Sequence, residues 1–129
     1  VSLGREFSDF SAVDRFDGET AYEGYLRTGG KKIPGARHWL CRAADERHAR
    51  AQRIVASNYE FLCEQTIDGG IRCGPDKKRA YLWYSLAMEN GDPEATSKLT
   101  SLRRNMTNQE ITEAKQMIRH WKPGQCPLP

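Results

Sequence analysis

Four cysteines are the residues with the clearest capacity for chemistry in this chain. A zinc site of the usual kind needs closely spaced pairs such as Cys-x-x-Cys, and this sequence has none. Reducing cytosol rarely maintains structural disulfides, so four cysteines in 129 residues favour disulfides and an oxidising compartment over zinc. The four are Cys41, Cys63, Cys73 and Cys126.

Other patterns of catalysis and metal binding are missing from the sequence. The three histidines, His38, His48 and His120, show no metal-ligand spacing. There is no GxSxG, SxxK or HExxH motif and no glycine-rich loop that would cradle a phosphate. We therefore expect no enzyme activity, no metal and no cofactor.

Two sets of residues have both a binding interpretation and a structural one. The cations Lys77, Lys78 and Arg79 oppose the dipole of the helix expected after Asp76, so they are either an anion patch or, preferably, a solvated helix start. Trp39 and Trp83 are suited to stacking on a ligand. Both have an alanine four residues later, and this spacing favours packing between helices.

Composition limits the classes of partner. Lys and Arg number 20 against 17 Asp and Glu, and the net charge of +3 is too small to favour nucleic acid or an acidic membrane. No apolar run approaches the length of a transmembrane helix. The length suits one domain. The chain starts at Val1 without a basic and apolar leader, as expected of a mature protein or an excised piece of one.

Local signals predict helices, and no strand, along the chain. Thr20 is suited to cap one helix, and Pro34 to lie in the first turn of the next. A further helix runs from Ala51 towards Leu62. The N-terminal segment 1–19 has apolar residues at a spacing of three, which suit a short helix: Phe7, Phe10, Val13 and Phe16.

The C-terminal half has sharper helix boundaries. Asp76 is expected to cap a helix that Gly91 ends in the left-handed conformation. Asp92, Pro93 and Glu94 suit the start of the next helix. A capping box at 107–110 then opens a final helix over 107–121.

A stretch of alanines and aromatic residues occurs twice. Residues 36–51 reappear as 80–95, shifted by 44 positions, and such an echo is typical of a repeat array. Arg47 stands where the second copy has Gly91, so we expect that the first turn cannot use the left-handed geometry that glycine permits. The matched pairs are Ala36 with Ala80, Trp39 with Trp83, Ala43 with Ala87 and Ala51 with Ala95.

These residues resemble the Sel1-like repeat family, a relative of the tetratricopeptide repeats. The match is closest over 80–87 and 90–95 and fair from 36–44 to Tyr59, and residues 106–123 resemble a helix that closes such arrays. The resemblance implies an all-α, right-handed α-solenoid of antiparallel helix pairs, with about two and a half repeats and a C-terminal closing helix. The expected organisation is an N-terminal segment 1–19, repeats over 20–123 and a tail 124–129.

The first copy departs from the family pattern by an insertion between about Leu62 and Gly74. Cys63 and Cys73 bracket the inserted loop, so a disulfide between them would close its base. By elimination, Cys41 is then expected to pair with Cys126, which requires the tail to fold back along the groove.

The resemblance also implies a function. Such proteins serve as adaptors of the bacterial envelope, so we expect a periplasmic or secreted monomer that binds a protein or peptide segment on its concave face. Arg37, Tyr81 and Ser85, together with Cys41, are the positions expected to be exposed there. Two alternatives remain open: an envelope binder of small molecules such as cell-wall fragments, with or without weak hydrolase activity, and a structural subunit that associates with copies of itself.

Overall fold

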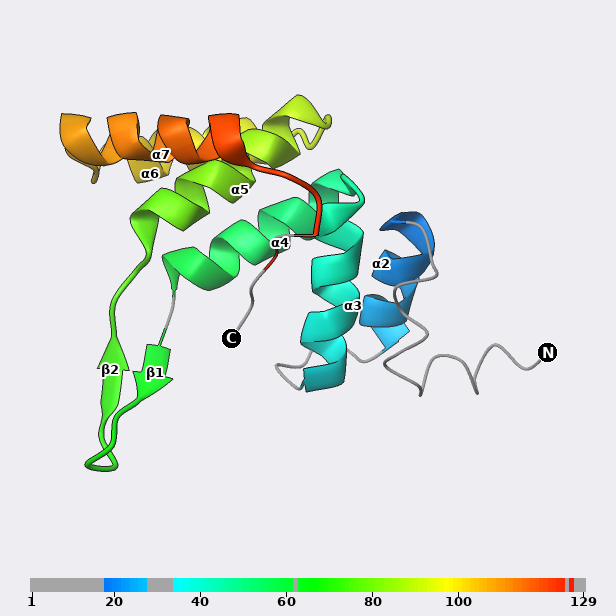
Figure 1. Ribbon diagram of the computed structural model, residues 1–129, viewed down its shortest axis with the longest axis horizontal. Coiled ribbons are helices and arrows are strands. Elements are labelled where there is room, and N and C mark those ends of the chain that lie inside the picture. The colour runs from blue at the N-terminus through cyan, green and yellow to red at the C-terminus, as the bar shows by residue number, and fades with distance from the viewer. Residues whose placement is uncertain (1–17, 28–33, 62, 125, 127–129) are drawn as a thin grey trace.

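A computed structural model of the chain describes residues 18–27, 34–61, 63–124 and 126. Within these ranges the chain folds into six helices and one two-stranded hairpin (Figure 1). The short helix expected from Phe7 to Phe16 lies outside the described residues. In chain order the elements are α2 (Gly18–Arg27), α3 (Pro34–Asp45), α4 (Ala49–Glu60), β1 (Cys63–Gln65), β2 (Ile71–Cys73), α5 (Lys77–Glu89), α6 (Ala95–Arg103) and α7 (Asn108–His120).

The predicted helix boundaries are confirmed at several positions. α3 begins at Pro34, and the Asp76 side chain caps α5 by accepting a hydrogen bond from the Arg79 N–H at 3.1 Å. Thr107 and Glu110 form the reciprocal capping box at the start of α7. One expected cap is wrong, because α2 begins at Gly18 and Thr20 therefore lies inside the helix.

The two copies of the repeat have equivalent backbone hydrogen bonds at the ends of α3 and α5. At the end of α3 the His48 N–H donates to the Ala43 carbonyl at 3.0 Å, and at the end of α5 the Asp92 N–H donates to the Ala87 carbonyl at 2.9 Å. Both turns use a left-handed residue, with φ of 64° at Arg47 and 97° at Gly91. The expectation that Arg47 would exclude this geometry is wrong, since the arginine adopts it despite its side chain.

Alanines and aromatic rings make the core. Trp39 and Trp83 are each 1% exposed, which confirms packing as their role. Alanines bring the helix backbones close together, and Gly24 of α2 goes further: a Cβ there would lie 2.6 Å from the Trp39 ring. The ring of Trp121, just after α7, packs edge to face against Trp83, with the ring centroids 6.0 Å apart.

α5 is the central helix of the described structure. It contacts α4 on one side and both α6 and α7 on others, while α3 joins α4 to α2. Figure 1 shows α7 leading into the tail that returns towards α3. The predominantly helical fold was predicted, and the arrangement of antiparallel pairs into a right-handed solenoid stays a prediction. None of the described helices is long and apolar enough to cross a membrane.

Buried polar side chains join the two copies. Gln52 of α4 is fully buried and donates to the Ala44 carbonyl at the end of α3 at 3.0 Å. Its amide oxygen accepts from Asn90, the residue that ends α5, at 2.9 Å. One side chain therefore satisfies polar groups at the ends of both equivalent helices, which fixes their relative positions.

The insertion forms the hairpin, and the prediction that the chain holds no strand is wrong. β1 and β2 pair antiparallel, and the hairpin projects from the end of the helices (Figure 1). Gly69, with φ of 86°, and a hydrogen bond from the Thr66 N–H to the Gly70 carbonyl close its turn. Strands of only three residues leave too few positions for an alternating pattern to be visible in the sequence.

Candidate functional site

The expected partner-binding residues do not form an exposed face. Tyr81 is 4% exposed and Ser85 is 7% exposed, so the prediction of exposure is wrong at both. The physical reason is the position of α5, which neighbouring helices cover on several sides. Arg37 lies on α3, but its side chain is outside the described residues.

Cys41 and Cys126 form a disulfide, the pairing that elimination indicated. Their Cα atoms lie 5.4 Å apart although 85 positions separate them in the chain. The bond attaches the tail beyond α7 to α3, in the N-terminal half (Figure 1). It therefore has an architectural role, and it is compatible with an oxidising compartment.

The register of the hairpin places Cys63 directly opposite Cys73. The Thr66 N–H donates to the Gly70 carbonyl at 2.9 Å, and hydrogen-bonded and non-hydrogen-bonded pairs alternate along an antiparallel ladder. Counting back from this pair makes Cys63 and Cys73 a non-hydrogen-bonded pair, whose Cα atoms are usually about 4.5 Å apart. That spacing suits a disulfide. The side chains themselves are outside the described residues, so the bond stays a prediction.

The cations at the start of α5 have partners within the fold. Lys78 forms an ion pair with Glu113 of α7 at 2.8 Å, and Lys77 donates to the Asn105 carbonyl at 2.8 Å. The pKa of Lys78 is raised by its hydrogen bond to Glu113. Arg79 pairs with Asp76 at 3.6 Å. These contacts favour a structural role for Lys77, Lys78 and Arg79 over a role as an anion patch.

The hairpin and its base carry exposed apolar side chains. Ile67 in the turn is fully exposed, Ile71 of β2 is 79% exposed, and Phe61 just before β1 is 67% exposed. These residues were not predicted from the sequence, although Ile71 directly follows the glycine pair Gly69-Gly70, which is a turn signal.

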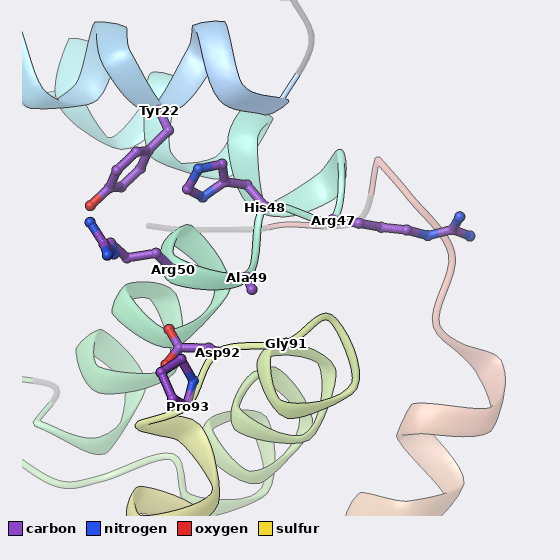
Figure 2. Close-up of a pocket in the computed structure, with 8 residues that line it drawn as sticks. All are labelled: Tyr22, Arg47, His48, Ala49, Arg50, Gly91, Asp92 and Pro93. Carbon is purple, nitrogen blue, oxygen red and sulfur yellow. The ribbon is translucent and has the colours of Figure 1, made fainter.

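A cavity of about 470 Å³ lies where three segments converge: α2, the turn between α3 and α4, and the turn between α5 and α6. Figure 2 shows the side chains that line it. No local motif predicts such a site, because its residues meet only when both copies of the repeat are packed. The lining residues are Tyr22, Arg47, His48, Ala49, Arg50, Gly91, Asp92 and Pro93.

One wall of the cavity is aromatic. The rings of Tyr22 and His48 stack with centroids 4.2 Å apart. The Nδ1 atom of His48 accepts a hydrogen bond from the Ala51 N–H at 3.2 Å and so caps α4. His48 therefore orients the Tyr22 ring while it ends the turn.

The opposite wall contains a paired carboxylate. Asp92 is 7% exposed, and its Oδ2 accepts from Arg53 at 2.8 Å. Its other oxygen accepts from the Glu94 N–H at 2.8 Å, while Arg53 also reaches Glu94 at 3.2 Å. Burial is the largest single influence on Arg53 and opposes its charge, but the hydrogen bond to Asp92 and the attraction of Asp92 and Glu94 together outweigh it and raise the pKa of the guanidinium. Each charge in this group has a partner, with one guanidinium shared between two carboxylates.

Comparison with family models, curated proteins and solved structures found no match to this chain. The resemblance to the Sel1-like repeats therefore remains a prediction from the residues quoted above. Among residues 18–27, 34–61, 63–124 and 126, no three histidine, cysteine or acidic side chains gather to hold a metal ion. The hairpin and the cavity are the two candidate sites.

Proposed function

We propose that this chain is a protein-binding module whose contact element is the hairpin of β1 and β2. The observation that carries the proposal is the exposure of Ile67, Ile71 and Phe61. Large apolar side chains exposed to water are typical of interaction sites. Ile67 and Ile71 lie on the insertion that the repeat itself does not need, and Phe61 lies just before it. The proposal assigns no reaction to the chain.

The form of the hairpin favours an extended peptide segment as the occupant. The described residues contain only a two-stranded sheet, so each strand has one edge without a neighbouring strand. An extended segment can pair with such an edge through its backbone while its apolar side chains cover the isoleucines. This proposal replaces the concave helix face as the contact surface, because Tyr81 and Ser85 are buried.

The compartment that we propose is the bacterial periplasm or the secreted space. The disulfide between Cys41 and Cys126 supports an oxidising environment. The resemblance to envelope adaptors is the other support.

Site-specific photo-crosslinking tests the function. A crosslinking residue is placed at position 67 and, as a control, at Lys98, an exposed position on α6. In an envelope extract, we expect a crosslinked partner from position 67 and none from position 98. Unlabelled wild-type protein should compete for this product.

A matched variant makes the test specific. Ile67→Ser together with Ile71→Ser should lose the ability to compete, with a free energy of unfolding within about 0.5 kcal/mol of wild type. Equal competition by the variant would contradict the proposal. Crosslinking only to a second copy of the chain would replace it by the self-associating alternative.

A further inference from the structure

The cavity between the two helix turns contains a cation whose charge is not neutralised. Asp92 is the only acidic residue in its lining, and Arg53 and the Glu94 N–H occupy its two oxygens. Arg50, in the first turn of α4, is exposed and forms no ion pair with any described residue. Arg50 therefore has no acidic partner, whereas Arg53 is shared between Asp92 and Glu94.

Figure 2 shows how the polar groups face the cavity. The guanidinium end of Arg50 and the hydroxyl of Tyr22 are turned towards one another, whereas the side chain of Arg47 extends away. Tyr22 is 6% exposed, so its ring is fixed by packing. A planar guanidinium and a hydroxyl that converge on one space can both donate to the same acceptor.

The backbone of two lining residues, Ala49 and Arg50, adds donors. The N–H groups of Ala49 and Arg50 open α4, and they have no acceptor among the described residues. The first turn of α4 contains no acidic residue to balance the positive end of the helix dipole. An anion in the cavity would interact favourably with both the dipole and Arg50.

We propose that this cavity binds a ligand through a single carboxylate, held by Arg50 and the Tyr22 hydroxyl. The charge of the site selects the class of ligand. With Arg47 turned away, Arg50 is the arginine of the lining that faces the cavity, and a single guanidinium matches a monovalent carboxylate better than a phosphate dianion. The volume of about 470 Å³ leaves room for more than a carboxylate group, so the site can accept a larger ligand that carries one.

Two sources can supply this chemistry: the C-terminus of a peptide and a small carboxylic acid. Titration of ¹⁵N-labelled protein at low salt and pH 7 separates them, with acetyl-trialanine as the first probe and sodium benzoate as the second. The amide of acetyl-trialanine is the uncharged control, and inorganic phosphate is the dianion control. We expect the Ala49 and Arg50 N–H signals to shift and saturate with the carboxylates and to respond least to the amide.

Variants assign the contacts. Arg50→Gln should weaken carboxylate binding about tenfold or more, because a charged hydrogen bond is lost. Tyr22→Phe should weaken it several-fold while the ring and the fold are kept. Arg103→Gln, at an exposed position on α6, should bind like wild type.

The outcomes decide the proposal. Saturation by acetyl-trialanine alone identifies a peptide terminus as the ligand, and saturation by both carboxylates identifies carboxylic acids in general. Equal binding of the amide, tighter binding of phosphate, absence of saturable shifts, or unchanged affinity of Arg50→Gln would each overturn it. The hairpin proposal is unaffected by any of these results, because Ile67 and Ile71 lie outside the cavity lining.

Discussion

Arg47 and Gly91 occupy equivalent turns with different energetic consequences. Both have positive φ, 64° and 97°, and the left-handed conformation is costly for a residue with a side chain. The Arg47 side chain is exposed, so the conformation is imposed by the turn, whose hydrogen bonds are the same in both copies. The turn of the repeat thus imposes the left-handed conformation on Arg47, although arginine disfavours it.

Exchanging the residue types at these turns should change stability in opposite directions. Arg47→Gly should raise the free energy of unfolding by up to about 1 kcal/mol, because strain relief exceeds the added freedom of the unfolded chain. Gly91→Ala should lower it by about 1 kcal/mol. A Cβ at Gly91 would meet no atom within 4 Å, so the loss there is conformational only.

Urea unfolding followed by tryptophan fluorescence measures both changes. Arg47→Ala is the matched control, since it removes the charge and keeps the Cβ, and it should unfold close to wild type. Destabilisation by Arg47→Gly that equals the effect of Gly91→Ala would show that the arginine conformation carries no strain.

At the scale of elements, a buried hydroxyl joins the neighbouring helices α4 and α5. The Tyr84 hydroxyl donates to Glu60 at 2.7 Å, and the ring is 1% exposed. Burial is the main cause of a raised pKa at Tyr84, and the hydrogen bond to Glu60 adds to it. Burial also raises the pKa of Tyr59 and of Tyr25. Ionisation of these phenols is therefore linked to unfolding.

The sign of this linkage predicts alkaline destabilisation. Below pH 10 tyrosine is protonated in both the folded and the unfolded chain, so these groups cause no loss of stability there. Above pH 10 the unfolded chain releases the protons and the folded chain retains them, which favours unfolding by up to about 1.4 kcal/mol per pH unit for each tyrosine. The free energy of unfolding of Tyr84→Phe, measured with urea, should therefore fall less steeply between pH 9 and pH 10.5 than that of wild type. Parallel curves would contradict the linkage.

The elements differ in how far the sequence determines them. Caps such as Asp76 and Thr107 act on backbone groups within one turn, so their residue types predict the helix starts. The hairpin was missed because three-residue strands depend on the turn at Gly69 rather than on any apolar pattern. Tyr81 was misplaced because one stripe of α5 was expected to face the neighbouring helices, whereas α4, α6 and α7 together cover most of it.

At the scale of the molecule, distant residues meet only through the packing of both copies. The cavity needs Tyr22, Arg50 and Asp92, which come from three separate segments, and Gln52 aligns the ends of α3 and α5 beside it. Local patterns contain no information about such convergence, so neither the cavity nor the buried glutamine was predicted. The disulfide between Cys41 and Cys126 could be predicted from the sequence because four cysteines allow few pairings.

The disulfide between Cys41 and Cys126 should be the larger of the two covalent contributions to stability. It links positions 85 apart and encloses α4 to α7, whereas a bond between Cys63 and Cys73 would close only the hairpin. In the chain-entropy model the longer loop restricts the unfolded chain more. Replacing Cys41 and Cys126 by serine should therefore cost about 2–4 kcal/mol and lower Tm by about 10 °C.

The matched variant, Cys63→Ser with Cys73→Ser, should lower Tm by less, because the hairpin projects from the helices and its opening leaves their core intact (Figure 1). Differential scanning calorimetry of both variants and of wild type, all without reductant, makes the comparison. Peptide mapping under non-reducing conditions first establishes whether Cys63 and Cys73 are bonded. A larger loss of Tm in the hairpin variant would mean that the hairpin, and not the returning tail, is the element on which the helical core depends.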